Sequence, residues 1–239
     1  DGLDDILAWR RERLWGIING IDYDIWNPSK DDKLVANYNT KTLKKGRAAN
    51  KIALQKELGL KEDENVFTIG LVSRLTDQKG LDLVDGIMDE LARRDINLIV
   101  LGSGDERYEN MFRYYSRKYP NKIAARIGYD EELSHLIYAG CDAFLVPSAF
   151  EPCGLTQLIA LRYGSLPIVH EIGGLKDTVK PYNQYEGSGT GFSFKGYSSS
   201  ELLDRINHAE WLYNDNTTEW KAMAKRAMKE DWSWTNSSK

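Results

Sequence analysis

Short apolar segments alternate with amphipathic segments along the chain from about residue 66 onward. Residues 66–72, VFTIGLV, form a nearly continuous apolar run, which is typical of a parallel strand buried on both faces. In the following segment, 81–92, apolar residues recur at the spacing of one helical stripe: Val84, Ile87, Met88 and Leu91. Because parallel strands are joined by crossover helices, the alternation predicts an α/β fold with a Rossmann-like, doubly wound parallel sheet.

The same pattern continues toward the end of the chain. Further strands are predicted at 97–101, 123–127, 143–146, 166–169 and, with a weaker signal, 191–194. Further helices are predicted at 105–118, 131–139, 155–163, 199–213 and 217–229. The first 65 residues differ, since they contain only an expected short strand at 17–22 and a helix at 42–58, which Gly59 ends.

Composition narrows the classes of partner and site. The 239 residues carry a net charge of −4, which predicts no nucleic-acid partner, and no apolar run is long enough to predict a membrane span. Three scattered histidines and two cysteines, Cys141 and Cys153, lack metal-site spacing, so we expect no metal and no cofactor. So few cysteines favour a reducing, cytoplasmic location, or a plastid if the source is a plant or alga.

The loop 73–80, SRLTDQKG, follows the first of the alternating strands and precedes a helix. Ligands of open α/β sheets bind beyond the carboxyl ends of the strands, which is where Arg74 and Lys79 would lie. Arg74 could grip a diphosphate as a bidentate fork and Lys79 could meet it as a point charge, while Gly80 lets the backbone come close. A solvated basic loop without a ligand is the alternative.

The segment 151–157, EPCGLTQ, joins the predicted strand 143–146 to the helix 155–163. A carboxylate at such a junction, here Glu151, can hold a polar ligand together with the free N–H groups of a helix start. On this segment alone, Glu151 could equally be an ordinary loop residue.

Three other loops follow strands of the same sheet. Gly102-Ser103-Gly104 could contact phosphate or form a tight turn, and Tyr129 could stack on a nucleobase or pack against its neighbours. Gly173 and Gly174 could offer backbone N–H groups to sugar hydroxyls or phosphate oxygens, or form a turn without a ligand. Because all these loops share one sheet edge, their combined cationic, aromatic, acidic and glycine-rich character predicts a site for a nucleoside diphosphate-sugar.

Four motifs, in this order, resemble those of bacterial glycogen synthases and plant starch synthases, glycosyltransferase family 5. They are 16–28 (GIINGIDYDIWNP), 73–80, 151–157 and 173–178 (GGLKDT), and the resemblance covers essentially the whole chain. It implies the carboxyl-terminal half of a GT-B glycosyltransferase, the half that holds the nucleotide-sugar. The family's amino-terminal Lys-Thr-Gly-Gly-Leu motif does not occur in this sequence.

The resemblance also implies a division of the chain. Residues 1–28 are expected to be a remnant of the amino-terminal domain with the interdomain linker, and 29–239 the nucleotide-sugar-binding domain. We expect both ends to have been cut from a longer protein.

The activity that the resemblance implies is transfer of glucose from ADP-glucose to the non-reducing end of an α-1,4-glucan, with retention of configuration and without a metal. Arg74 and Lys79 would stabilise the departing diphosphate, where one lost donor costs about 3–4 kcal/mol, and Glu151 would bind glucose and support its positive charge. Tyr129 would stack near the adenine. Further donor contacts would come from Cys153, Gly154, Leu155, Thr156, Gly173, Gly174 and Leu175. The glucan acceptor would bind through the amino-terminal domain, so this chain alone is expected to bind but not to catalyse.

Three positions bear on that expectation. Many retaining GT-B enzymes carry a second Glu eight positions after the first, but this chain has Ile159 there. Bacterial-type glycogen synthases share this departure. With no second carboxylate of the kind that retaining glycosidases use, a front-face reaction assisted by the leaving phosphate is the hypothesis. His170 and Ile172 stand where the family usually has Arg and Thr, so contacts of those side chains are in doubt. A GT-B enzyme with another donor and a binding module without catalysis remain as alternatives, and the sequence does not decide between ADP and UDP.

Overall fold

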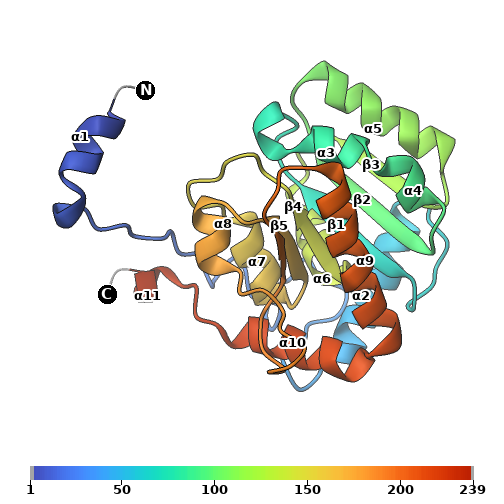
Figure 1. Cartoon of the computed structure of the whole chain (residues 1–239). Helices are drawn as coiled ribbons and strands as arrows, with labels where there is room; N and C mark the ends of the chain where they lie inside the picture. Colours follow the sequence, from blue (N-terminus) through green and yellow to red (C-terminus); the bar gives the residue numbers. More distant parts are fainter. Residues whose placement is uncertain (1–2, 238–239) are drawn as a thin grey trace.

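The computed structural model describes residues 3–237 of the chain, and its centre is one fully parallel sheet (Figure 1). The strands lie in the order β3-β2-β1-β4-β5-β6. Their bounds are β1 Phe67–Val72, β2 Ile96–Gly102, β3 Ile123–Ile127, β4 Ala143–Val146, β5 Leu166–His170 and β6 Phe192–Phe194. All six strands were predicted, and β1, β2, β4 and β5 are buried almost throughout, as their unbroken apolar runs indicated.

Helices cover both faces of the sheet. The helix α9 crosses β1, β5 and β6 on one face beside α3, whereas α6 and α7 pack on β1, β4 and β5, with α2 against α6 and α10 against α7 (Figure 1). The bounds of the longer helices are α2 Leu43–Glu57, α5 Glu106–Lys118, α6 Glu131–Gly140, α7 Thr156–Tyr163, α9 Ser199–Asp215 and α10 Thr217–Lys229. The shorter ones are α3 Leu81–Asp85, α4 Met88–Ala92, α8 Gly173–Thr178 and α11 Trp234–Ser237. The α/β, Rossmann-like fold class is therefore confirmed.

Two expected elements are wrong in detail. The helix predicted at 81–92 is two short helices, α3 and α4, because the chain breaks at Gly86, a poor helix former. A side chain there would also meet Ser199, since a Cβ on Gly86 would lie 2.4 Å from Ser199 Oγ. The strand predicted at 17–22 does not form, because Ile21 joins the carboxyl-terminal segment by one bridge to Ser233 and reaches no strand of the sheet.

The opening of the chain lies apart from the sheet. It forms the helix α1 (Asp4–Trp9) and a 3-10 turn, η1 (Arg11–Arg13), which Figure 1 shows projecting from the body on an extended segment. Its large apolar side chains are exposed, with Trp9 at 81% and Trp15 at 86%. None of the helices within residues 3–237 combines the length and apolar character that crossing a bilayer requires.

A buried polar cluster fixes the segment after Trp26 to the helices α6 and α7. Asp31 Oδ2 lies 2.7 Å from His135 Nδ1 and accepts a hydrogen bond from Tyr163 Oη at 2.5 Å. Trp26 stacks on His135 with their ring centroids 4.0 Å apart. Because these contacts are buried and link Trp26 and Asp31 to side chains of α6 and α7, the cluster joins the linker region to the domain core.

The order of the strands sets the place of a ligand site. Chain progression reverses between β1 and β4, which are neighbours in the sheet. In open α/β sheets the crevice beyond the carboxyl ends at this reversal is where ligands bind. The loops that follow β1 and β4 are 73–80 and 147–155, so the two motifs singled out in the sequence flank the crevice.

Candidate functional site

The two central loops meet in an ion pair. Lys79 Nζ lies 2.6 Å from Glu151 Oε2, and both side chains are largely shielded from solvent, at 18% and 10% exposure. The Ser148 hydroxyl donates to the same carboxylate oxygen at 3.3 Å. The predicted cation and the predicted carboxylate, 72 residues apart in the chain, are thus direct partners.

The backbone holds these loops against each other. The Ala149 N–H donates to Gln78 O at 2.9 Å, and Gln78 Nε2 donates to Phe150 O at 3.2 Å. Gly80 has a left-handed backbone with φ of 69°, and a Cβ on it would lie 2.0 Å from Pro147 O. Only glycine fits this contact, so the role of Gly80 in the structure is to let the two loops touch.

Arg74 is the free cation of the site. It is exposed, and within residues 3–237 it has no carboxylate partner. The nearby acid Asp77 is held by Arg107 and by the Tyr108 hydroxyl, which donates to Asp77 Oδ1 at 2.6 Å. Arg74 is therefore open to an external anion, whereas Lys79 must first share or leave Glu151.

A hollow of about 410 Å³ lies beside Arg74. Aromatic side chains of Trp26, Tyr129 and Tyr138 line it together with Ser73, Arg74, Gly102 and Ser103. Tyr129 is 87% exposed, so its ring face is available for stacking. The volume and the mixture of aromatic and polar walls suit a small organic ligand.

A second, much smaller hollow of about 20 Å³ lies beside Lys79, and Ser73 lines both hollows. The smaller one is lined by Lys79, Ser148 and Thr156 as well. A ligand with an aromatic end and a charged end would meet Tyr129 at one end and Lys79 at the other. The structure thus brings Arg74, Lys79, Glu151, Tyr129 and Thr156 to one edge of the sheet.

The backbone of 153–154 is fixed by Gln157, a buried residue that the sequence reasoning did not single out. Gln157 Nε2 donates to Cys153 O at 2.7 Å and to Gly154 O at 3.0 Å. Cys153 and Gly154 are partly exposed and Leu155 is exposed, so all three remain accessible. The position of Gln157 in the first turn of the predicted helix was the available signal, because a side chain there faces back toward the preceding loop.

The loop of Gly173, Gly174 and Leu175 packs directly on the Glu151 loop. The Gly174 N–H donates to Glu151 O at 3.0 Å, so this amide is already engaged, and a Cβ on Gly173 would lie 2.2 Å from Glu151 O. Leu175 is fully buried in a small apolar cluster with Val146 and Val179. Of the three, Gly173 is the one that is exposed at the site.

The departures from the resemblance also have places in the structure. His170 is buried, with Nδ1 2.8 Å from Ser148 O and Nε2 3.2 Å from Lys195 O, so its ring supports the loop that carries Ser148. Ile159 is buried and lines the larger hollow. Ile172 is partly buried against the cluster around Leu175. Ser148 was missed by the sequence reasoning, although its place directly after a strand was a signal.

Within residues 3–237, no three His, Cys, Asp or Glu side chains are grouped so as to hold a metal ion.

Comparison with protein families shows that residues 50–229 match a family described as glycosyl transferases group 1. The chain belongs to this family. The fold is the carboxyl-terminal, Rossmann-like half of a GT-B glycosyl transferase.

Relatives within the glycosyl transferases confirm the resemblance to glycogen and starch synthases. The chain is 56% identical over its whole length to a glycogen synthase of Lachnospira eligens and 52% identical to one of Lachnoclostridium phytofermentans. It spans about half, 50%, of each of these relatives. Among solved structures, the chain is similar to the catalytic domain of starch synthase IV from Arabidopsis thaliana, bound to ADP and acarbose. The match covers 99% of this chain and 49% of the starch synthase chain, with a TM-score of 0.92 and 34% identity.

Proposed function

We propose that this chain is the donor-binding half of a glycogen or starch synthase, a retaining hexosyltransferase that moves glucose from ADP-glucose to the non-reducing end of an α-1,4-glucan. The observation that carries the proposal is the Lys79–Glu151 pair at 2.6 Å, with Arg74 free beside it, at the reversal point of the sheet. The relatives named above and the ADP-bound starch synthase support the choice of reaction and nucleotide.

In this proposal Arg74 and Lys79 bind the diphosphate. Arg74 offers a planar fork that suits two phosphate oxygens, and Lys79 offers a compact charge from the shielded side. When the bond between glucose and phosphate breaks, negative charge grows on the departing diphosphate. Cations fixed where that charge develops lower the barrier, and loss of one such group costs about 3–4 kcal/mol in activation free energy.

Glu151 faces the glucose in this proposal. Its carboxylate is held on one side by Ser148 and Lys79, so it points in a fixed direction. A negative group there would stabilise the positive charge that develops on the sugar ring as the bond breaks. Since the aliphatic Ile159 stands at the position of the second carboxylate, that position offers no nucleophile, which supports a front-face reaction in which the leaving phosphate assists the incoming hydroxyl.

The larger hollow would hold the adenine. Tyr129 would stack on the base, and Trp26 lines the same hollow. Remaining donor contacts in the proposal come from the backbone and side chains of Cys153, Gly154, Leu155, Thr156, Gly173, Gly174 and Leu175. For Gly174 this requires the present amide bond to Glu151 O to be shared, and for Leu175 the contact would be through the backbone.

The acceptor glucan would bind through an amino-terminal domain that faces this site. We propose that residues 1–28 belong to that domain and to the linker, and that 29–239 form the donor domain. The exposed Trp9, Trp15 and Ile17 support this division, because apolar side chains of that size are usually covered by another surface. On its own, the chain would bind donor but not elongate glucan. The proposal extends to a cytoplasmic location, which suits the free thiols of Cys141 and Cys153.

Calorimetry on the chain with ADP, ADP-glucose and UDP-glucose tests the donor site. We expect ADP and ADP-glucose to bind and UDP-glucose to bind more weakly. Absence of ADP binding by the folded chain at millimolar concentration would refute the assignment of the donor site. A preference for UDP-glucose would refute ADP-glucose as the donor.

Glucan elongation by the full-length enzyme tests the reaction. The Glu151→Ala variant should lose at least about two orders of magnitude in kcat, as expected for a charge-stabilising group at the reacting centre. Undiminished elongation in that variant, with wild-type protein measured alongside, would refute the role given to Glu151.

A further inference from the structure

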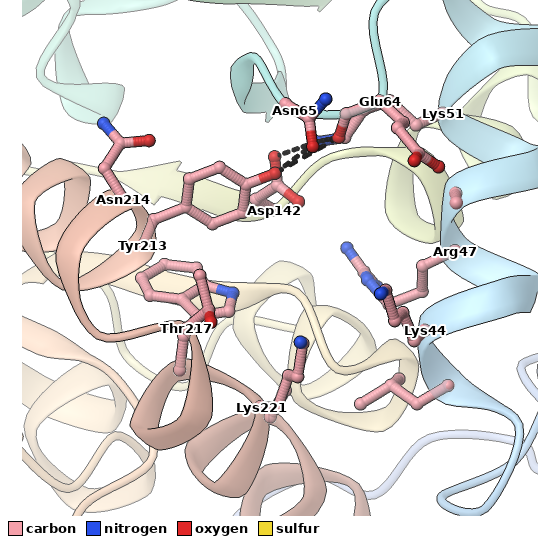
Figure 2. A pocket seen from close by; sticks show the side chains of 14 residues that line it. Lys44, Arg47, Lys51, Glu64, Asn65, Asp142, Tyr213, Asn214, Thr217 and Lys221 are labelled. Carbon is pink, nitrogen blue, oxygen red and sulfur yellow. Dashed lines mark hydrogen bonds and ion pairs between the residues drawn. The ribbon is translucent and has the colours of Figure 1, made fainter.

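A third hollow, separate from the two at the donor site, lies at the opposite edge of the sheet. Its volume is about 390 Å³, and it opens between α2, the turn that precedes β1, and the junction of α9 with α10 (Figure 2). Glu64 and Asn65 lie just before β1, and Asp142 lies just before β4, so the hollow sits at the amino ends of the strands whose carboxyl ends carry the donor loops. It shares no lining residue with the donor hollows.

Two helix faces supply most of its walls. From α2 come Lys44, Arg47, Ala48 and Lys51, and from α10 come Thr217, Trp220, Lys221 and Ala224. Each set recurs every three or four residues and so forms one stripe of its helix. Figure 2 shows Lys221 extending from α10 into the space that Lys44 and Arg47 enter from α2.

The charge of the lining is opposite in sign to that of the chain. Four cations and two carboxylates line the hollow, which leaves an excess of two positive charges in a protein whose net charge is −4. One carboxylate is already neutralised, since Lys51 Nζ lies 2.5 Å from Asp142 Oδ2 in a buried pair. The other, Glu64, is exposed and turns its backbone carbonyl to Lys51 and Tyr213.

No carboxylate of the described residues neutralises the remaining cations of the lining, Lys44, Arg47 and Lys221. Lys44 and Lys221 have no ion-pair or hydrogen-bond partner within residues 3–237. Arg47 is fixed by donating to the carbonyl oxygens of Tyr163, at 2.6 Å, and Cys141, which neutralises none of its charge. A guanidinium has five N–H donors, so further donors of Arg47 remain for a ligand.

We infer that this hollow is a binding site for a small phosphate-bearing anion. One rigid cation and two mobile ones converge on a concavity within the size range of small-molecule sites, about 300–1,000 Å³, and the neutral Asn65, Asn214 and Thr217 can bond to the rest of such a molecule. Phosphate oxygens match this set, because they accept several charge-assisted hydrogen bonds at once. The inference does not depend on the proposed glycosyl transfer.

Titration of the 239-residue chain with inorganic phosphate, followed by amide NMR at ionic strength matched with sodium chloride, tests the site. We expect phosphate to cause saturable shifts of the amide signals of Asn65 and Thr217, which line this hollow, with a dissociation constant of about 1 mM. Signals of Ser73 and Lys79 report separately on phosphate at the donor edge. Pyrophosphate serves as the second probe.

The double variant Lys44→Gln/Lys221→Gln should weaken the Asn65 and Thr217 response about tenfold or more, since one lost charge-assisted bond is worth roughly that factor. Its Ser73 and Lys79 response should be unchanged. Lys225→Gln, on α10 but outside the lining, is the matched control and should behave as wild type. Absence of saturable shifts at Asn65 and Thr217, or equal weakening by the control, would overturn the inference, whatever happens at the donor edge.

Discussion

In the proposed function, the ion pair between Lys79 and Glu151 would act on a diphosphate in two opposite ways. Lys79 would attract it, while Glu151 would both repel it and occupy Lys79. A nucleoside diphosphate without its sugar would be repelled by the Glu151 carboxylate and would lack the contact that Glu151 is proposed to make with the sugar. The roles proposed for the pair therefore separate affinity for the nucleotide from catalysis of transfer, and single substitutions can distinguish the two.

Glu151→Gln should tighten ADP binding by roughly three- to tenfold, because a nearby like charge is removed and Lys79 is released. Lys79→Gln should weaken ADP about tenfold or more, because a shielded charge-assisted bond is lost. Calorimetry of both variants checks this. Glu171→Gln removes a carboxylate at the same sheet edge that contacts Ser193 and not Lys79, so it is the control and should leave ADP affinity unchanged.

Asp31 predicts a pH dependence of stability. Burial alone would raise the pKa of Asp31, but hydrogen bonds from His135 and Tyr163 outweigh it and hold the pKa below its ordinary value of 3.8. A lowered folded-state pKa means that this carboxylate stabilises the fold fully above pH 3.8 and that the stabilisation is lost as the pH falls through the lower folded value. Urea unfolding between pH 6 and pH 3 should show a shallower loss of stability in Asp31→Asn than in wild type.

Wild-type and variant curves that fall in parallel would contradict the role given to Asp31. Asp95, an exposed carboxylate paired with Lys122, supplies the matched variant, Asp95→Asn, whose curve should follow the wild type.

Single residues differed in how far the sequence could place them. Arg74, Lys79, Glu151 and Tyr129 lie in loops that follow strands, and the rule that carboxyl ends share an edge brings these loops together. That Glu151 would pair with Lys79 could not be predicted, because the contact depends on the side-chain geometry of two loops 72 residues apart. The burial of Leu175 was missed because its motif was interpreted by chemistry alone.

At the scale of elements, strands buried on both faces were the most predictable part. The apolar runs of β1, β2, β4 and β5 indicated such burial, and all six strands were found at nearly the expected bounds. The break between α3 and α4 was missed because Val84, Ile87 and Met88 keep a helical spacing across Gly86. The strand at 17–22 was wrong because a strand needs a neighbour, and its neighbour was the carboxyl-terminal segment.

The loop between β1 and α3 predicts a large effect of a small substitution. Gly80→Ala should lower the free energy of unfolding by about 3 kcal/mol or more, the sum of left-handed strain and a clash with Pro147 O. Gly59→Ala is the matched control, because φ there is 68° and nothing lies within 4 Å of a Cβ. It should lose only about 1 kcal/mol.

Urea denaturation of the two variants measures the difference. Equal losses would mean that the contact between the loops of Lys79 and Glu151 contributes nothing beyond backbone strain.

At the scale of the whole molecule, alternation predicted the class of fold but not the order of its strands. The order β3-β2-β1-β4-β5-β6 depends on which face each crossover takes, and periodicity does not record that choice. Nor could it show that residues 19–23 lie against the end of the chain, where the Ile21 N–H donates to Trp232 O at 2.8 Å and the Trp232 N–H donates to Tyr23 Oη at 2.8 Å. Contacts between distant segments are set by packing, which no local pattern contains.

Two amino-terminal deletions test how the opening segment belongs to the molecule. A chain that starts at Ile18 should keep the wild-type Tm, because every deleted side chain that the structure describes is exposed. A chain that starts at Asn27 loses Trp26 and its stacking on His135, which should cost about 2–4 kcal/mol and lower Tm by about 5–10 °C. Thermal unfolding by circular dichroism measures both, and equal Tm values for the two deletions would contradict the structure.

The loops of Lys79 and Glu151 are bonded to each other through Gln78, Ala149 and Phe150, and these hydrogen bonds require no ligand. Ordering a flexible loop consumes about 1–2 kcal/mol of conformational entropy per residue, and here that loss belongs to folding and not to binding. An arriving anion needs only to draw the Lys79 ammonium group away from Glu151. Its association rate should therefore be governed by diffusion and ionic strength, with no slow phase from loop closure.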